Sequence, residues 1–370
     1  MSLPTSFSRF SALAGAAVLI TSLAACGSAN SSDTQSDAGA SAGESASLSG
    51  NLAGAGASSQ EAAMEAWKAG FAAVQPAVAV SYDAVGSGAG ITQFADSQVL
   101  WAGSDAPLEG EEIEAARARC GSPAWALPVY ISPVAVIFNL EGVDALNLDA
   151  ATIAKIFTGE IAKWNDPAIV ASNPGVELPD LAITPVHRSD KSGTTENFTD
   201  YLHEAAPEAW AYDPAKEWPI EGGESGDKTA GVVQAVTEGA GAIGYADASQ
   251  AGDLGTVALA AADGTFVSFS NETAAAAADT ASPVEGREAN DIALKVNRVP
   301  ATNNAYPLVL VSYSIVCSAY ADANEAALVK AFVGYQVSEE GQRMAADNAG
   351  SAPLSAAMTA KVRAALDAIR

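Results

Sequence analysis

Three clusters of glycine and hydroxyl residues each stand directly before a stretch with helical periodicity. They are residues 54–61 (GAGASSQE), 86–90 (GSGAG) and 188–196 (RSDKSGTTE). The first turn of a helix carries backbone N–H groups that have no partner within the helix, and the helix dipole is positive there. Small anions bind at such ends. A single glycine–serine turn is usually only a turn, but three clusters, one of which begins with arginine, predict an anion-binding site.

The spacing within these clusters fits other known motifs poorly. The dinucleotide fingerprint G-x-G-x-x-G would require glycine at Ser59. A Walker loop would require two glycines that Lys191-Ser192 lacks. The nucleophile elbow G-x-S-x-G would require glycine at Val85, two residues before Ser87. The clusters are therefore better explained by a bound anion than by a dinucleotide, a nucleoside triphosphate or an acyl-enzyme.

An extracellular hydrolase is the enzymatic alternative. A phosphatase would need metal ligands, or a nucleophile with a base. The chain has two histidines, His187 and His203, and no strong serine motif accompanies either, so we interpret both as surface or structural residues. Two histidines and three cysteines also leave few ligands for zinc. The sequence thus predicts a binding protein with no metal and no cofactor, and not an enzyme.

Length and charge limit the architecture and the partners. At roughly 150 residues per domain, 370 residues suggest two domains. The 18 basic and 44 acidic residues give a net charge of −26, which argues against nucleic-acid binding and against electrostatic docking on anionic lipid. Because charges beyond about 8 Å are screened at physiological salt, this excess does not exclude a small buried anion site.

Short apolar runs alternate with helical patterns, which predicts an α/β fold. The expected strands are Ala77–Tyr82, Val99–Gly103, Ala126–Phe138, Ala182–His187, Ala242–Tyr245 and Leu308–Cys317. The expected helices are Gln60–Gln75, Gly90–Phe94, Leu108–Arg119, Asp149–Phe157, Gly193–Glu204, Thr229–Glu238 and Asp322–Val337, with a further helix near Ala274–Ala278 and another over Ala356–Arg370. Ser58 and Glu61 have capping-box spacing, so Ser58 is predicted as an N-cap.

The N-terminus has the pattern of an export signal. Arg9 precedes a mostly apolar stretch, Phe10–Ile20, which is too short to span a bilayer but suits a signal peptide. The residues Leu23-Ala24-Ala25-Cys26-Gly27 resemble a bacterial lipobox, in which the cysteine carries the lipid. We therefore expect a signal peptide over 1–25, a lipid anchor at Cys26 and a flexible Ser/Gly/Ala tether over 26–49. The alternative is an ordinary signal peptide with a chance cysteine.

Once Cys26 is assigned to the anchor, Cys120 and Cys317 remain. They are even in number and belong to a part of the chain that is expected outside the cell, so a disulfide between them is plausible. Two buried thiols are the alternative.

Six stretches occur in the same order as in a known family. They are residues 54–58 (GAGAS), 85–90 (VGSGAG), 103–107 (GSDAP), 156–164 (IFTGEIAKW), 188–194 (RSDKSGT) and 241–245 (GAIGY). With this ordered set, the chain resembles the phosphate-binding lipoproteins of high-affinity phosphate ABC transporters, the PstS family. The resemblance runs from about residue 50 to the C-terminal helix, and the lipobox agrees with it.

The resemblance implies a two-lobed, periplasmic-binding-protein-like α/β fold of type II, with the ligand cleft between the lobes. Two chain crossings, near Tyr130–Pro133 and Ala305–Leu308, would divide the chain into lobe 1 (50–131 and 307–370) and lobe 2 (132–306). The protein would act as a monomer on the outer face of the bacterial membrane. Its partners would be inorganic phosphate and the permease subunits of a phosphate ABC transporter.

The resemblance also implies the ligand set, carried over by motif. The phosphate ligands would be Ser58, Ser59, Ser87, Asp105, Arg188, Ser192, Gly193 and Thr194, with Asp190 orienting Arg188. One position departs from the family, which often has threonine–phenylalanine where this chain has Ser58-Ser59. The hydroxyl and the backbone amide remain, but an aromatic wall is lost.

Asp105 gives the expected site its selectivity. An ionised carboxylate only accepts hydrogen bonds, so it suits an anion that still carries a proton, as phosphate does at neutral pH and sulfate does not. In isolation, Asp105 would be read as a turn residue before Ala106-Pro107. Arsenate shares the shape and the proton of phosphate, so a module or sensor for another oxyanion, without transport, is the alternative function.

Overall fold

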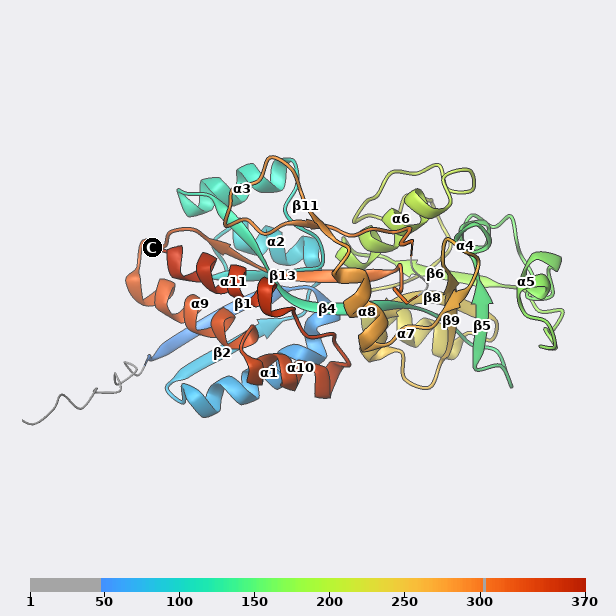
Figure 1. Ribbon diagram of the computed structural model, residues 1–370, viewed down its shortest axis with the longest axis horizontal. Helices are drawn as coiled ribbons and strands as arrows, with labels where there is room; N and C mark the ends of the chain where they lie inside the picture. Colours follow the sequence, from blue (N-terminus) through green and yellow to red (C-terminus); the bar gives the residue numbers. More distant parts are fainter. Residues whose placement is uncertain (1–47, 302–303) are drawn as a thin grey trace, which may run out of the picture. The chain divides into compact units, whose positions relative to one another are not determined.

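Two long antiparallel strands, β4 (Ala124–Phe138) and β13 (Val309–Cys317), form the centre of the main sheet. They belong to a computed structural model that describes residues 48–301 and 304–370. Among the described residues the main strands follow the order β2-β1-β3-β13-β4-β8-β6-β7, and β9 adds to β4 with β5 and β10 beside it. Figure 1 shows β4 and β13 side by side, with helices packed around the sheet.

The remaining strands are short. They are β1 (Gly50–Gly56), β2 (Val78–Asp83), β3 (Trp101–Ser104), β5 (Ala145–Leu148), β6 (Thr184–Arg188), β7 (Glu224–Gly226), β8 (Ala242–Asp247), β9 (Gly255–Ala260), β10 (Phe266–Val267), β11 (Ser282–Pro283) and β12 (Leu294–Lys295). The α/β class and the six strands expected from the sequence are confirmed, with ends that shift by a few residues.

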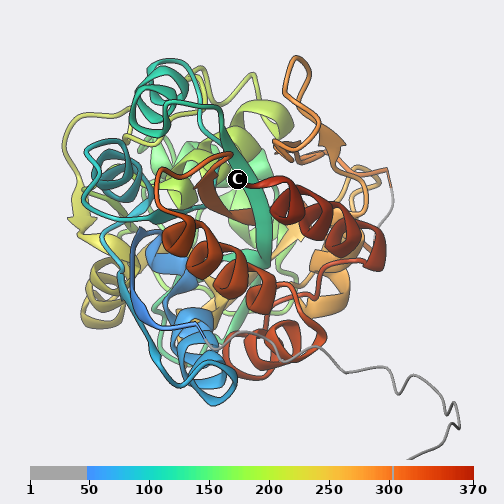
Figure 2. The ribbon, with the colours of Figure 1, turned by 90° about the vertical axis from the view of Figure 1, so that its left-hand side faces the viewer.

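The helices also follow the predicted order. They are α1 (Glu61–Val74), α2 (Ser87–Ala95), α3 (Glu111–Cys120), α4 (Ala150–Phe157), α5 (Pro167–Ser172), α6 (Gly193–Ala205), α7 (Lys228–Glu238), α8 (Asn271–Ala278), α9 (Ala323–Gln336), α10 (Glu339–Ala349) and α11 (Ala356–Ala368), with short 3₁₀ turns η1 (Ser58–Gln60) and η2 (Ala248–Gln250). Helices α9, α10 and α11 pack together near α1, from the opposite end of the described chain (Figure 2). None of the described helices is long and apolar enough to cross a membrane.

Strand β1 was not expected, because its glycines were assigned to a helix start. Gly54 lies against the ring of Trp101, and a Cβ at Gly54 would stand 2.3 Å from that ring. Gly56 has φ +152° and lies against the backbone of Gly103 in β3. The two glycines therefore serve close packing of β1 on β3, which is one reason for glycine within a strand.

Strand β4 changes partners along its length. Residues 124–133 pair with β13, whereas Val134 to Phe138 pair with β8, so that Pro133 faces Val309 and Val134 faces Asp247. All of β4 after Ala124 is buried. Strands β1 and β3 reach this pair on one side through β13, and β6, β7 and β8 lie on the other. The loops that follow the strands of the two groups can therefore meet beside the β4–β13 pair.

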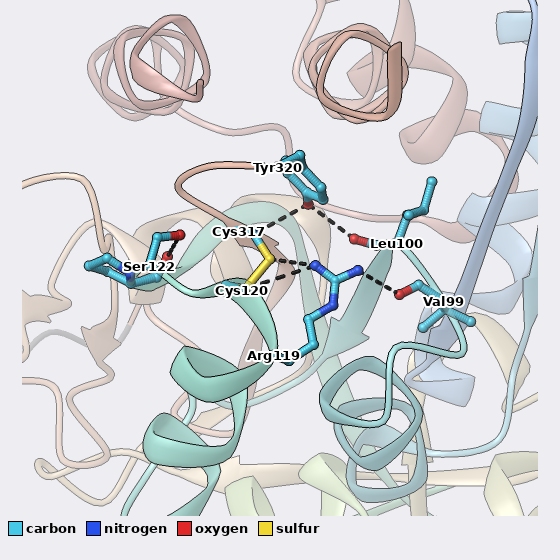
Figure 3. Close-up of a disulfide and its surroundings, with 8 residues drawn as sticks. Val99, Leu100, Arg119, Cys120, Ser122, Cys317 and Tyr320 are labelled. Atoms are coloured by element: carbon cyan, nitrogen blue, oxygen red, sulfur yellow. Dashed lines mark hydrogen bonds between the residues drawn. A yellow bond between two sulfur atoms is a disulfide. The ribbon is translucent and has the colours of Figure 1, made fainter. Parts of the chain in front are cut away.

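A disulfide joins Cys120, the last residue of α3, to Cys317, the last residue of β13, with an Sγ–Sγ distance of 2.00 Å. Of the two states that the sequence left open, the structure has the bridge. The guanidinium of Arg119 donates to both the sulfur of Cys317 and the carbonyl of Val99 (Figure 3). It also lies 4.6 Å from the centroid of the Phe94 ring, a cation–π distance. The bridge thus joins the end of α3 to the end of β13, and Arg119 links this point to α2 and to the loop before β3.

The signal peptide (1–25), Cys26 and the tether up to residue 47 lie outside the described residues. Strand β1 begins at Gly50, and Leu48 is already held by a hydrogen bond from its N–H to the side chain of Gln75.

Candidate functional site

Parallel strands deliver most of the predicted site residues. Strands β2 and β3 both pair parallel with β1, and each of the three is followed by a predicted ligand. On the other side, β6 pairs parallel with β7 and β8, and α6 and α7 begin after β6 and β7. Because the carboxyl ends of parallel strands lie at one edge of a sheet, the turns after β1, β2, β3, β6 and β7 converge.

Asp105 is the centre of a buried hydrogen-bond cluster. Ser59 Oγ and Ser312 Oγ each donate to its Oδ1 at 2.6 Å, and Thr194 Oγ1 donates to Oδ2 at 3.1 Å. Its backbone N–H donates to Ser87 Oγ at 3.2 Å. Burial raises the pKa of Asp105, while the hydrogen bonds from the three hydroxyls act in the opposite direction. The side chain is thus an acceptor surrounded by donors, and it is not merely a turn residue.

Arg188 is buried, with 3 % of its surface exposed, and forms a two-point ion pair with Asp190. Its Nε donates to Oδ1 at 2.7 Å and its Nη2 to Oδ2 at 2.6 Å, and the backbone N–H of Lys228 adds a third bond to Oδ1 at 3.0 Å. Burial raises the pKa of Asp190, but the hydrogen bonds and the charge of Arg188 outweigh burial and lower it. Asp190 therefore fixes the plane of the guanidinium.

Two glycines allow the second and third glycine and hydroxyl clusters of the sequence to approach each other closely. Gly86 has φ +91°, and a Cβ there would stand 2.4 Å from Asp190 Oδ2. A Cβ on Gly193 would stand 2.7 Å from the Cβ of Asp105 and 2.8 Å from Ser87 Oγ. These contacts bring the second and third sequence clusters together, although about a hundred residues separate them in the chain.

The start of α6 has the expected form of an anion-binding helix end. Ser192 is the N-cap, and its Oγ accepts from the N–H of Thr195 at 3.2 Å. Gly193 and Thr194 are the first two helical residues, whose N–H groups have no acceptor within a helix. Ser192, Gly193 and Thr194 are all buried, and Gly193 lies against Asp105, so the start of α6 is enclosed beside this carboxylate.

The prediction that Ser58 is an N-cap is wrong. Ser58 begins the 3₁₀ turn η1, the N-cap of α1 is Gln60, and no side chain caps α1. Ser58 Oγ instead lies 2.9 Å from Thr229 Oγ1 and accepts from the N–H of Thr229 at 3.2 Å. The hydroxyl of Ser58 therefore does not cap α1, because it bonds Thr229 at the start of α7, 171 residues away.

Comparison with known proteins agrees with this geometry. A family model described as the PBP superfamily domain matches residues 40–340. Phosphate-binding protein PstS 3 of Mycobacterium leprae is 40% identical over 299 residues, which are 80% of each chain. PstS2 of Mycobacterium bovis is 36% identical over 321 residues, 84% of this chain and 85% of the relative.

The chain belongs to the PstS family.

Solved structures of this kind share the fold. A high-affinity periplasmic phosphate-binding protein, PfluDING, bound with phosphate, superposes with a TM-score of 0.71 at 25% identity and covers 85% of this chain and 93% of its own. The phosphate-binding protein of Stenotrophomonas maltophilia has a TM-score of 0.65 at 20% identity, with 85% and 94% covered. The architecture is therefore the two-lobed, periplasmic-binding-protein-like α/β fold that the sequence predicted.

The hydrogen-bond donors at this site are mostly uncharged groups. Among the described residues, no group of three or more His, Cys, Asp or Glu side chains could hold a metal ion. The charged groups at the site are the buried Arg188 and Asp105 and the half-buried Asp190, and the other polar groups are hydroxyls and helix-start amides. Such a site can bind and orient a small oxyanion. It also presents one carboxylate, Asp105, that can accept a hydrogen bond from a protonated oxygen of the ligand.

Sequence reasoning missed two hydroxyl residues at this site. Ser312 lies in β13 and donates to Asp105, and Thr229, the second residue of α7, bonds Ser58. The sequence predicts Thr229 only as the start of a helix. Ser312 carried a usable signal, because Ser312 and Ser314 interrupt an otherwise apolar and fully buried strand, and a buried hydroxyl needs a partner.

Ser59, which stands where the family often has phenylalanine, is fully buried. Its hydroxyl donates to Asp105, so the aromatic wall is replaced by a third hydroxyl donor to the carboxylate.

Proposed function

We propose that this protein binds inorganic phosphate outside the cytoplasm and delivers it to the permease of a phosphate ABC transporter. The observation that carries the proposal is a buried carboxylate, Asp105, that lies among hydroxyl donors beside a helix start and a buried arginine. The relatives named PstS and the phosphate-bound structural neighbour support the choice of phosphate.

The proposed ligand set is the one expected from the sequence: Ser58, Ser59, Ser87, Asp105, Arg188, Ser192, Gly193 and Thr194, with Asp190 as the orienting partner. Arg188 supplies a planar charged donor, which binds an oxyanion at two points. The hydroxyls and the amides at the starts of α2 and α6 supply the other donors. Ser59 contributes its backbone amide, because its hydroxyl already donates to Asp105.

The proposed selectivity for phosphate over sulfate follows from Asp105, the one group among the proposed ligands that only accepts hydrogen bonds. An ionised Asp105 repels a fully deprotonated anion and accepts a hydrogen bond from one that carries a proton. A buried polar contact that stays unsatisfied costs about 1–3 kcal/mol, and more when the group is charged. Phosphate therefore satisfies the site, whereas sulfate leaves an oxygen facing the carboxylate.

Titration calorimetry with phosphate, sulfate and arsenate tests the function. We expect tight phosphate binding, a similar response to arsenate and weak sulfate binding. A parallel incubation with a chromogenic phosphate ester should show no turnover. Sulfate binding as tight as phosphate binding would contradict the proposal, and ester hydrolysis would point to an enzyme.

Replacing Asp105 by asparagine should lower the phosphate-to-sulfate affinity ratio by at least about tenfold, or ~1.4 kcal/mol. The substitution keeps an acceptor oxygen and nearly the same shape, adds an NH₂ donor and removes the repelling charge. Sulfate should therefore gain more than phosphate. Both affinities are measured at neutral pH and fixed salt, and an unchanged ratio would show that the proton of phosphate is read elsewhere.

The two lobes are proposed as residues 50–131 with 307–370, and residues 132–306. Three contacts between these parts support closure around the ligand: Ser58 with Thr229, the N–H of Gly88 to the carbonyl of Lys191 at 3.1 Å, and Thr194 with Asp105. A ligand held from both sides favours the closed form. We expect phosphate to reduce the radius of gyration in small-angle scattering. No change at saturation would count against closure.

We also propose a lipid anchor at Cys26 and a monomeric protein at the outer face of the membrane. The lipobox and the predicted tether support this placement. Cys26→Ser should keep export but release the protein into the culture fluid or periplasm, because the lipid site is lost. Fractionation measures the result. Retention of the variant in the membrane fraction would show that another segment holds it.

A further inference from the structure

Arg298 is a buried arginine that belongs to none of the motifs singled out in the sequence. It is 4 % exposed and lies in the segment between β12 and β13. Its Nε donates to Asp200 on α6 at 2.7 Å, and its Nη1 donates to the carbonyl of Val309 at the start of β13 at 2.7 Å. Its Nη2 donates to the side-chain oxygen of Asn197. One guanidinium thus links α6 to the first residue of β13.

Arg298 decides which way the amide of Asn197 points. A guanidinium only donates hydrogen bonds, so Oδ1 of Asn197 must face it and Nδ2 must face the other way. There, Nδ2 donates to the carbonyl of Asp105 and to the carbonyl of Gly193, both at 2.8 Å. Asn197 is itself 6 % exposed. Its two N–H groups therefore join the Asp105 turn to the start of α6.

The same region contains open space beside both the Asp105 turn and α6. A cavity of about 370 Å³ is lined by Asp105, Asn197 and Arg298, together with Lys295, Tyr313 and other residues. The hydroxyls of Ser59 and Ser312 hold the Asp105 carboxylate from the side of η1 and β13, so it is on the α6 side that the Asp105 turn depends on the bond from Asn197. The Thr194 hydroxyl is the remaining described side-chain bond from α6 to Asp105.

We propose that Arg298 is a positioning residue for anion selectivity: acting through Asn197, it sets the place of the Asp105 carboxylate relative to the first residues of α6. This inference rests on the proposed function. Arg298 does not contact the proposed ligand set directly. When the bonds from Asn197 are lost, the start of α6 can shift relative to the Asp105 carboxylate. The carboxylate then accepts the hydrogen bond of the phosphate proton less well and repels sulfate less, so the two affinities converge.

Lysine cannot replace Arg298 in this role. The four bonds of the guanidinium diverge to Asp200, Asn197 and two carbonyls, those of Val309 and Pro307. An ammonium keeps the charge but lacks the planar fork that reaches these acceptors together. Arg298→Lys therefore tests geometry at constant charge, and Asn197→Leu removes the bonds to Asp105 and Gly193 with little change in size.

The test is the phosphate-to-sulfate affinity ratio, measured by calorimetry together with the thermal midpoint of each variant. Arg298→Lys and Asn197→Leu should each lower the ratio about tenfold, and the double variant should lower it no further, because the two residues act in series. Lys295→Met is the matched control: Lys295 is the last residue of β12, three residues before Arg298, and pairs with Glu204 on the same helix, α6, at 2.9 Å, but is exposed. The control should keep the wild-type ratio.

The outcomes distinguish a failure of the proposed function from a failure of the positioning role of Arg298. If wild-type protein does not prefer phosphate over sulfate, the proposed function fails. If wild-type protein does prefer phosphate and the variants lower only the thermal midpoint, Arg298 is structural and this inference is overturned. If Arg298→Lys does not fold, the ratio of Asn197→Leu decides, and an unchanged value overturns the inference.

Discussion

Replacing Arg188 by methionine should weaken phosphate binding at least about a thousandfold, or ~4 kcal/mol. Charge-assisted bonds to an oxyanion are roughly twice as strong as neutral ones, and Arg188 is the buried cation of the proposed ligand set. The substitution removes both its charge and its planar donor. Calorimetry with phosphate at neutral pH measures the loss.

A second effect of this substitution must be separated from binding. Without Arg188, the carboxylate of Asp190 keeps the amide of Lys228 but loses its cation, and removing one partner of a buried pair is itself destabilising. The double variant Arg188→Met/Asp190→Asn removes the unpaired charge. It should regain much of the stability and still fail to bind phosphate.

Arg287→Met is a control for the loss of a partly buried ion pair elsewhere, since Arg287 pairs with Asp291 at 3.1 Å. This control should bind phosphate normally. Near-normal binding by folded Arg188→Met protein would show that helix-start amides and hydroxyls hold the anion without the arginine.

Loss of the Cys120–Cys317 bridge should lower the free energy of unfolding by about 2–5 kcal/mol. The bridge closes a loop between residues that are 197 apart in sequence, and long loops gain most from a cross-link in the chain-entropy account. Denaturant unfolding of the Cys120→Ser/Cys317→Ser variant and of wild-type protein measures the difference. The phosphate affinity of the folded variant should not change, because neither cysteine contacts the proposed ligand set.

Two further observations check the bridge. Wild-type protein treated with reductant should move towards the stability of the serine variant, while the variant itself should not respond. Thiol titration of unfolded, unreduced protein should find no free Cys120 or Cys317. Two free thiols in that experiment would show that the bridge does not form in the mature protein.

The candidate site could be predicted from the sequence where its residues follow one another in the chain. The stretch from Arg188 to Thr194 carries the cation, its orienting carboxylate and the helix start within one turn, and the structure places them together as a local motif. Strand β4 and strand β13 were visible as long apolar runs for a similar reason: both are buried on both faces.

The remaining parts depend on contacts that no local pattern contains. Ser312 reaches Asp105 across 207 residues, and Arg298 reaches Asn197 across 101. Ser58 has a local capping pattern, but its hydroxyl bonds Thr229 instead. The local sequence around Gly54 and Gly56 predicts a helix start, because their packing partners, Trp101 and Gly103, lie on another strand. In each case a tertiary contact overrides a local preference.

The position of β13 also determines the order in which this chain can fold. Strand β13 lies between β3 and β4, so its register pairs residues 309–317 with residues 102–133, which are much earlier in the chain. The centre of the sheet therefore cannot close until about 85% of the chain, through Cys317, has been synthesised. Contacts of such high sequence separation make folding slow. For a chain that is exported as we propose, this delay is an advantage, because the closing strand is among the last parts to be synthesised.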